Sequence, residues 1–204
     1  MKPLALLLAA CLLAPHSAQA LDLDLQGHRG ARGLAPENTL VGFARALAIG
    51  VTTLETDIAI TRDGVLVISH DPALNPDITR GPDGQWLATR GPLIFHTPLE
   101  TLRSFDVGHL KPGTRYAAQF PEQQPADGAR LPTLAELFAL VKRAGNPPAG
   151  QAPVRLALET KLTPNAPDDT AAPEPFAKAL VAAVRDAGLA SRTSILSFDW
   201  RTLA

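Results

Sequence analysis

Seven side chains suited to catalysis or ligand binding occur in four short clusters of this sequence. The clusters are His28-Arg29-Gly30, Glu55-Thr56-Asp57, His70-Asp71 and Glu159-Thr160-Lys161. Their two imidazoles, three metal-competent carboxylates, guanidinium and ammonium are the groups needed to hold a divalent metal, grip a phosphate and move protons. Each cluster lies at or near the end of a segment patterned like a β-strand. In a barrel of parallel strands, such ends converge on one site.

Residue alternation separates charged from aliphatic side chains along two of these segments. In a strand over 53–60, Glu55 and Asp57 point to one face and the intervening aliphatic residues to the other. A strand over 154–161 places Glu159 on its charged face in the same way. Helices covering the aliphatic faces would turn the charges inward, toward the interior of the sheet.

Inward-facing carboxylates indicate a bound cation, because burying unpaired charge is strongly unfavourable. Glu55, Asp57 and Glu159 offer hard oxygen ligands, which favour Mg²⁺ or Ca²⁺. A single Glu-x-Asp would more simply be the solvent-facing side of an amphipathic strand. Two strands of matching polarity, together with two nearby histidines, favour a metal site.

His28 and His70 are the candidate general acid and base, because each stands at a strand end beside a charged residue. Arg29 and Lys161 are suited to a phosphate, the first through its planar fork and the second as a point charge. The alternative role for these two cations is to balance the carboxylates. The remaining histidines are interpreted as incidental: His16, His96 and His109.

The order of the expected elements predicts a parallel α/β sheet. Pro36 and Glu37 are expected in the first turn of a helix that ends before Gly50, and Thr133 is expected to cap another with Glu136 at the capping-box position. Residues 71–130 lack strong periodicity and are interpreted as an inserted excursion over the site. Strands are expected at 21–28, 53–60, 65–69, 154–161 and 193–198, a further helix at about 176–187, and another starting at Asp199.

The pattern of the N-terminal twenty residues predicts a secretory signal peptide. Lys2 precedes an apolar run that is too short to span a bilayer, and a small-x-small site predicts cleavage after Ala20. The single cysteine, Cys11, lies in this run; a lipoprotein anchored there is the less favoured alternative, because the apolar run continues past it. A periplasmic or secreted protein without a transmembrane segment in its mature chain is therefore expected.

Length and composition favour one domain, and after removal of the signal no cysteine is expected to be left for a disulfide. The 19 basic and 20 acidic residues nearly balance, which argues against nucleic acid or an anionic membrane as an electrostatic partner. A hydrophobic fraction of 46% is enough to form a core. The mature residues, 21–204, are interpreted as one domain that carries the excursion.

Taken together, these motifs resemble the glycerophosphodiester phosphodiesterase family. The resemblance runs from about Leu25 to the end of the chain, and each tripeptide alone is weak whereas their combination is specific. It rests on the four clusters above and on Pro36-Glu-Asn-Thr39, Asp63-Gly64, Leu131-Pro-Thr-Leu134 with Glu136, and Ser197-Phe198.

The resemblance implies a TIM-type (β/α)₈ barrel that hydrolyses glycerophosphodiesters to glycerol 3-phosphate and an alcohol. It implies His28 and His70 as the acid/base pair, and a divalent metal held by Glu55, Asp57 and Glu159. Arg29 and Lys161 would hold the phosphate of a small-molecule substrate. The substrate's own glycerol hydroxyl would attack phosphorus, and water would then open the cyclic phosphate.

The chain is shorter than this resemblance would lead us to expect. A full barrel has eight strands and about 250 residues, whereas four barrel strands are expected here. We therefore expect about the first half of the barrel, consistent with a C-terminally truncated chain. Two alternatives stay open: an inactive or phosphate-binding half-barrel, and a related phospholipase-type phosphodiesterase.

Overall fold

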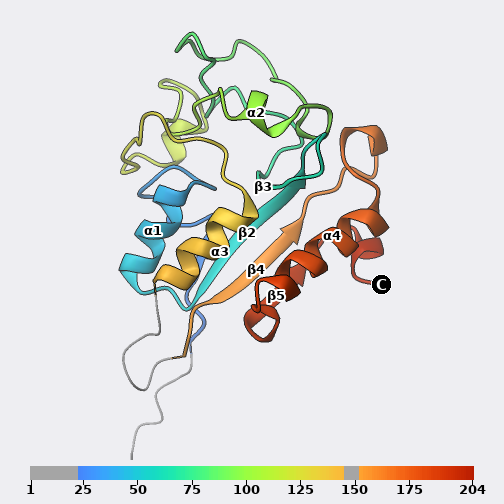
Figure 1. Ribbon diagram of the computed structural model, residues 1–204. Coiled ribbons are helices and arrows are strands. Elements are labelled where there is room, and N and C mark those ends of the chain that lie inside the picture. Colours follow the sequence, from blue (N-terminus) through green and yellow to red (C-terminus); the bar gives the residue numbers. More distant parts are fainter. Residues whose placement is uncertain (1–22, 145–151) are drawn as a thin grey trace, which may run out of the picture.

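The computed structural model of the protein describes residues 23–144 and 152–204. The expected signal peptide, its cleavage site and Cys11 lie outside this part, so they remain predictions. One sheet runs in the order β1-β2-β4-β5 with parallel neighbours, and β3 pairs antiparallel with β2 (Figure 1). The strands are β1 Gln26–His28, β2 Thr53–Ile60, β3 Leu66–Ile68, β4 Arg155–Thr160 and β5 Thr193–Leu196.

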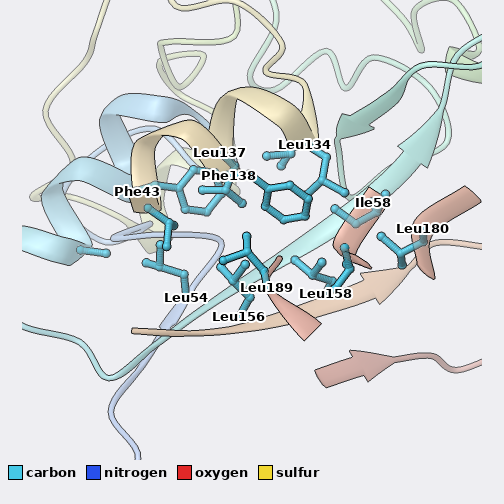
Figure 2. Close-up of a cluster of buried hydrophobic side chains, with 14 of the residues drawn as sticks. Phe43, Leu54, Ile58, Leu134, Leu137, Phe138, Leu156, Leu158, Leu180 and Leu189 are labelled. Carbon is cyan, nitrogen blue, oxygen red and sulfur yellow. The ribbon is translucent and has the colours of Figure 1, made fainter. Parts of the chain in front are cut away.

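Three helices cover one face of this sheet: α1 Leu40–Ile49, α3 Leu134–Arg143 and α4 Pro173–Asp186 (Figure 1). Their apolar sides meet the aliphatic residues of β2 and β4, as the alternation predicted. Burying those side chains removes apolar surface from water, which is the main favourable term in folding. Figure 2 shows the resulting core, formed by Phe43, Leu54, Ile58, Leu134, Leu137, Phe138, Leu156, Leu158, Leu180 and Leu189.

The start of α1 corrects one expectation. Thr39 is the N-cap, so Pro36 and Glu37 precede the helix instead of lying in its first turn; the Thr39 hydroxyl accepts a hydrogen bond from the Gly42 backbone at 3.0 Å. Asn38 has φ +53°, a left-handed conformation that the first turn of a helix cannot contain. Residues 36–38 are therefore a loop before the helix. The capping box predicted at Thr133 is present in α3.

Strand ends also differ from expectation. Of the strand expected at 21–28, residues 21 and 22 lie outside the described part and β1 covers Gln26–His28; just before it, the Leu25 backbone oxygen accepts a hydrogen bond from the Thr52 backbone amide at 2.9 Å. Asp24 instead binds side chains, including the Thr53 hydroxyl at 2.6 Å. β5 ends at Leu196, and Asp199 caps the 3₁₀ turn Trp200–Thr202 at the position where a helix was expected to start.

Residues 71–130 contain short elements around a second core. They lie beyond the end of the sheet toward which β2 points (Figure 1). Leu74, Ile94 and Leu102 pack there against Ala59 and Val67 of the sheet. The short elements are the 3₁₀ turns Ile94–His96 and Ala117–Gln119 and the helix α2 Leu99–Leu102; elsewhere, 3₁₀ turns occur at Pro167–Asp169 and Ala190–Arg192. No helix within the described residues has the length and apolarity to cross a membrane.

Candidate active site

The three predicted metal ligands lie together on the face of the sheet opposite the helices. Asp57 of β2 stands directly opposite Glu159 of β4 in the parallel register, and Glu55 is two residues earlier in β2. One carboxylate oxygen from each lies within 4.8 Å of the others. The exposed fractions of Glu55, Asp57 and Glu159 are 7, 1 and 9%. The solvent-facing alternative is therefore excluded by burial.

This acidic triad (Glu55, Asp57 and Glu159) has the chemistry of a site for a hard cation. Burial, and then the neighbouring charge of Asp57, raise the pKa of Glu55 above its ordinary value. The mutual repulsion of like charges held this close is strongly unfavourable unless a nearby cation compensates for it. Three carboxylate oxygens fit a divalent ion that prefers oxygen ligands, so the donor set suits such a group.

Lys161 supplies one positive charge to the triad. Its ammonium lies 2.7 Å from Glu159 Oε1 and 3.1 Å from Asp57 Oδ1. The Phe198 ring lies on another side, with its centroid 5.9 Å from the nitrogen. In this structure Lys161 thus balances the carboxylates, which was the alternative role considered for it.

Arg29 lies in the tight loop that follows β1. Its backbone φ of +56° turns the chain so that its amide donates to Glu55 Oε2 at 3.0 Å. The guanidinium Nη1 donates to Glu37 Oε1 at 2.9 Å, and Nε lies 3.3 Å from Asp57 Oδ2. Burial lowers the pKa of Arg29, but the charges of Glu37 and Asp57 raise it more, and the guanidinium stays charged.

His28 stands at the edge of the acidic triad. Its Nε2 lies 3.8 Å from Glu55 Oε2, and Arg32 Nη2 lies 3.1 Å from its Nδ1. A guanidinium can only donate, so this geometry assigns Nδ1 as the acceptor and the proton of the neutral ring to Nε2. Burial first, and then the charges of Arg32 and Arg29, lower the pKa of His28.

His70 is oriented by the residue that follows it. Its Nδ1 lies 2.8 Å from Asp71 Oδ1, and Asn75 Nδ2 donates to the other Asp71 oxygen at 2.7 Å. Burial raises the pKa of Asp71, but its contacts with His70 and Asn75 and the charge of Arg29 together lower it more. His70 and Asp71 line a cavity of about 30 Å³ together with Glu37 and Asn38. The structure thus places His70 beside the loop that carries Arg29.

Three residues near the site were not predicted to act there. Asn38 bridges the site to the sheet, because its amide donates to Asp57 Oδ2 at 2.9 Å and accepts from the Thr56 hydroxyl at 2.9 Å. Glu37 binds Arg29, and the Tyr116 hydroxyl donates to Glu37 from the excursion. Glu37 and Asn38 belong to the Pro36-Glu-Asn-Thr39 motif, which was a signal of their importance. Tyr116 carried none.

The other histidines in the described part of the chain have separate surroundings. His96 Nε2 lies 2.7 Å from the Asp168 backbone oxygen, and His109 Nδ1 lies 3.1 Å from Asp127. Neither contact involves the acidic triad or its cations.

Comparison with known proteins shows which family has this arrangement of site residues. The model of the glycerophosphoryl diester phosphodiesterase family matches residues 28–204, which include every site residue described above. The chain belongs to this family. The resemblance inferred from the motifs is thereby confirmed.

Individual relatives agree with the family model. A glycerophosphodiester phosphodiesterase of Caldanaerobacter subterraneus is 33% identical over 114 residues, covering 56% of this chain and 38% of the relative. A crystal structure from Silicibacter pomeroyi, described as a glycerophosphoryl diester phosphodiesterase, superposes with a TM-score of 0.80 at 39% identity. The match covers 89% of this chain and 59% of that one. A glycerophosphodiester phosphodiesterase from Agrobacterium tumefaciens has a TM-score of 0.57 at 26% identity, over 87% and 58% of the two chains.

The predicted fold class is also confirmed. The sheet of parallel strands, covered by helices on one face, matches part of the family's barrel. The chain spans less than two thirds of the length of these relatives, from 38 to 59%.

Proposed function

We propose that this phosphodiesterase-family chain hydrolyses glycerophosphodiesters to glycerol 3-phosphate and an alcohol, with a divalent metal at the acidic triad. The observation that carries the proposal is the buried triad of Glu55, Asp57 and Glu159, flanked by two cations and by His28. Family membership supports the substrate class.

Glu55, Asp57 and Glu159 would hold the ion, and their oxygen ligands favour Mg²⁺ or Ca²⁺. When bound, such an ion lowers the charge on the phosphate and favours the attacking alkoxide. Arg29 and Lys161 would bind the phosphate oxygens. Arg29 Nε and Lys161 Nζ lie 3.3 and 3.1 Å from the Asp57 carboxylate. Their positive charges are therefore next to the triad, which supports this role.

His28 and His70 would transfer the protons. In the first step the substrate's glycerol hydroxyl attacks phosphorus; one histidine accepts its proton while the other protonates the departing alcohol. In the second step water opens the cyclic phosphate, and the two histidines exchange roles. Asp71 holds His70 through Nδ1, so Nε2 is the nitrogen that exchanges protons with the substrate.

The place of action is proposed from the N-terminus. The predicted signal peptide and cleavage after Ala20 would deliver the chain to the periplasm or to the medium. There its substrates would be small soluble diesters, and the near balance of charge gives no reason to expect nucleic acid as a partner.

A second candidate concerns the head group. A human glycerophosphoinositol inositolphosphodiesterase is 41% identical over 69 residues, which is 32% of this chain and 13% of the relative. A phosphoinositol diester is therefore the alternative substrate to a choline or ethanolamine diester.

A substrate panel tests the proposal. The full chain is incubated with glycerophosphocholine, glycerophosphoinositol and sphingomyelin, and the released phosphate monoesters are identified. Release of glycerol 3-phosphate that His28→Ala reduces at least about 100-fold, and His96→Ala leaves intact, supports the proposal. Cleavage of sphingomyelin alone would reassign the substrate class, and equal turnover by wild type and His28→Ala would reject the mechanism.

A further inference from the structure

Tyr116 connects the excursion to the candidate phosphate-binding arginine. Its hydroxyl donates to Glu37 Oε2, and the other oxygen of the same carboxylate accepts from Arg29 Nη1 at 2.9 Å. A chain of two hydrogen bonds thus runs from residues 71–130 to the guanidinium. Tyr116 is the single tyrosine of the sequence.

The hydrogen bond to Glu37 fixes the orientation of the Arg29 guanidinium. Nε of Arg29 lies near Asp57 but without the alignment of a hydrogen bond. Within the part of the chain that the structure describes, Glu37 is the one side chain that accepts a hydrogen bond from this guanidinium. A planar guanidinium binds a phosphate well only when its fork faces the ligand, so its rotation affects binding.

The Glu37 carboxylate depends in turn on the tyrosine. Glu37 is 6% exposed, so water offers its second oxygen little compensation. A buried charged acceptor that loses its donor is strongly unfavourable. Without the Tyr116 hydroxyl we expect Glu37 to rotate toward other donors and to release its hold on Arg29.

The segment around Tyr116 is held by further contacts. Gln123 Nε2 donates to the Arg32 backbone oxygen at 2.7 Å, and the Gln124 backbone N–H donates to the Leu34 backbone oxygen at 3.1 Å. The Phe120 ring packs edge-on against Tyr116. These contacts do not need the hydroxyl, so Tyr116→Phe removes one hydrogen bond and leaves the segment docked.

We propose that Tyr116 is a positioning residue: through Glu37 it holds the Arg29 guanidinium in the orientation that binds the phosphate of the substrate. The excursion (residues 71–130) would thereby take part in substrate binding. This inference rests on the proposed role of Arg29 as a phosphate ligand, and it goes further by assigning Tyr116 and Glu37.

The competing explanation is that Tyr116 only fastens the excursion. In that case phosphate affinity would follow the general stability of the segment. Phe120→Leu is the matched control, because it removes the ring that packs against Tyr116 while Tyr116, Glu37 and Arg29 keep all their hydrogen-bonding groups.

The test measures calorimetric binding of inorganic phosphate to the full chain in Tyr116→Phe, Glu37→Gln, the double variant and Phe120→Leu. Tyr116→Phe should weaken binding about tenfold. Glu37→Gln should weaken it at least as much, and the double variant no more than Glu37→Gln alone, because both changes break one chain of contacts. Phe120→Leu should bind like wild type. Wild-type affinity in Tyr116→Phe, additive losses in the double variant, or an equal loss in Phe120→Leu would overturn the proposal.

A spectroscopic readout checks the contact itself. Burial, followed by the charge of Glu37, raises the pKa of the Tyr116 hydroxyl above its usual value. At about pH 10, where a free tyrosine is half ionised, the wild type should show almost no tyrosinate absorbance, and Glu37→Gln should show clearly more. Substantial tyrosinate in the folded wild type would contradict the contact. Phosphate binding without any hydrolysis would reject the proposed function and leave the positioning role of Tyr116 supported.

Discussion

At the scale of single residues, Asp57 organises the site. It is 1% exposed, and three side chains meet its carboxylate: Arg29, Asn38 and Lys161. A carboxylate this deeply buried is stable only with such partners. The same partners fix its oxygens in place, which prepares them for a ligand.

Lys161 gives a prediction with a definite sign. Its ammonium lies within 3.1 Å of two of the three triad residues, so it competes with a divalent ion for their charge. Lys161→Met should bind Ca²⁺ several-fold more tightly in calorimetry and should bind phosphate more weakly. Lys178→Met, at an exposed Lys–Glu pair on α4, is the control and should change neither affinity. Weaker Ca²⁺ binding by Lys161→Met would show that the ammonium supports the metal site.

Asp71 gives a second residue-scale prediction. An asparagine there keeps the shape but can present an amide to His70 Nδ1, which alters the tautomer or the orientation of the ring. We expect Asp71→Asn to lower kcat about 10- to 100-fold with little change in KM. Steady-state kinetics on glycerophosphocholine measures both constants. A change confined to KM would mean that His70 acts in binding and not in proton transfer.

Residue-scale predictions from the sequence succeeded where periodicity determines the geometry. Glu55 and Asp57 were assigned to one inward face because a strand alternates, and their carboxylate oxygens do lie within 4.8 Å of each other and of Glu159. The contact between Glu37 and Tyr116 spans 79 positions. No local pattern encodes such a contact, since it depends on how the excursion folds over the site.

At the scale of elements, the loop between β1 and α1 carries much of the site. Arg29 and Asn38 both have positive φ, so this loop stores unfavourable backbone conformations. Its hydrogen bonds to β2, from the Arg29 amide and the Asn38 side chain, hold it in that shape. From the sequence, Pro36 and Glu37 were expected in the first turn of a helix. Proline and an acidic residue suit such a turn, but the tertiary contacts of Asn38 prevail over that local preference.

Two glycines in this loop form a matched test. Gly30 has φ +82°, and a Cβ there would lie 2.7 Å from the Gly42 carbonyl carbon in α1. Gly33 has nothing within 4 Å of a Cβ. Gly30→Ala should lower the free energy of unfolding by about 2–5 kcal/mol, whereas Gly33→Ala should change it by about 0.5 kcal/mol or less. Urea denaturation measures both, and equal stability of the two variants would contradict the packing of this loop against α1.

At the scale of the whole molecule, the sheet has two edges that no further strand of the described residues pairs with. Among the described residues β1 pairs with β2 alone, and β5 pairs with β4 alone. Large apolar side chains are exposed near both: Leu23 is 72% exposed beside β1, and Phe198 and Trp200 are 91 and 80% exposed after β5. Open edges and exposed apolar surface promote association. The sequence predicted a partial barrel from its strand count, but which side chains would be exposed required the structure.

We therefore expect this chain to associate as its concentration rises. Sedimentation velocity over a hundredfold range of concentration should show an increasing sedimentation coefficient. The double variant Phe198→Ser, Trp200→Ser should shift that increase to higher concentration, and Val41→Ser on α1, which is 47% exposed, is the control. A monomer at every concentration would show that the open edges are protected.

The central claim is that the acidic triad binds the metal on which phosphodiester cleavage depends. The most direct measurement is release of glycerol 3-phosphate from glycerophosphocholine by chelator-treated protein, titrated with Mg²⁺ or Ca²⁺. We predict negligible release without metal, recovery that saturates at about one bound ion per chain, and no recovery in Asp57→Asn at the same concentrations. Undiminished release by the metal-free protein, or full recovery in Asp57→Asn, would contradict the claim.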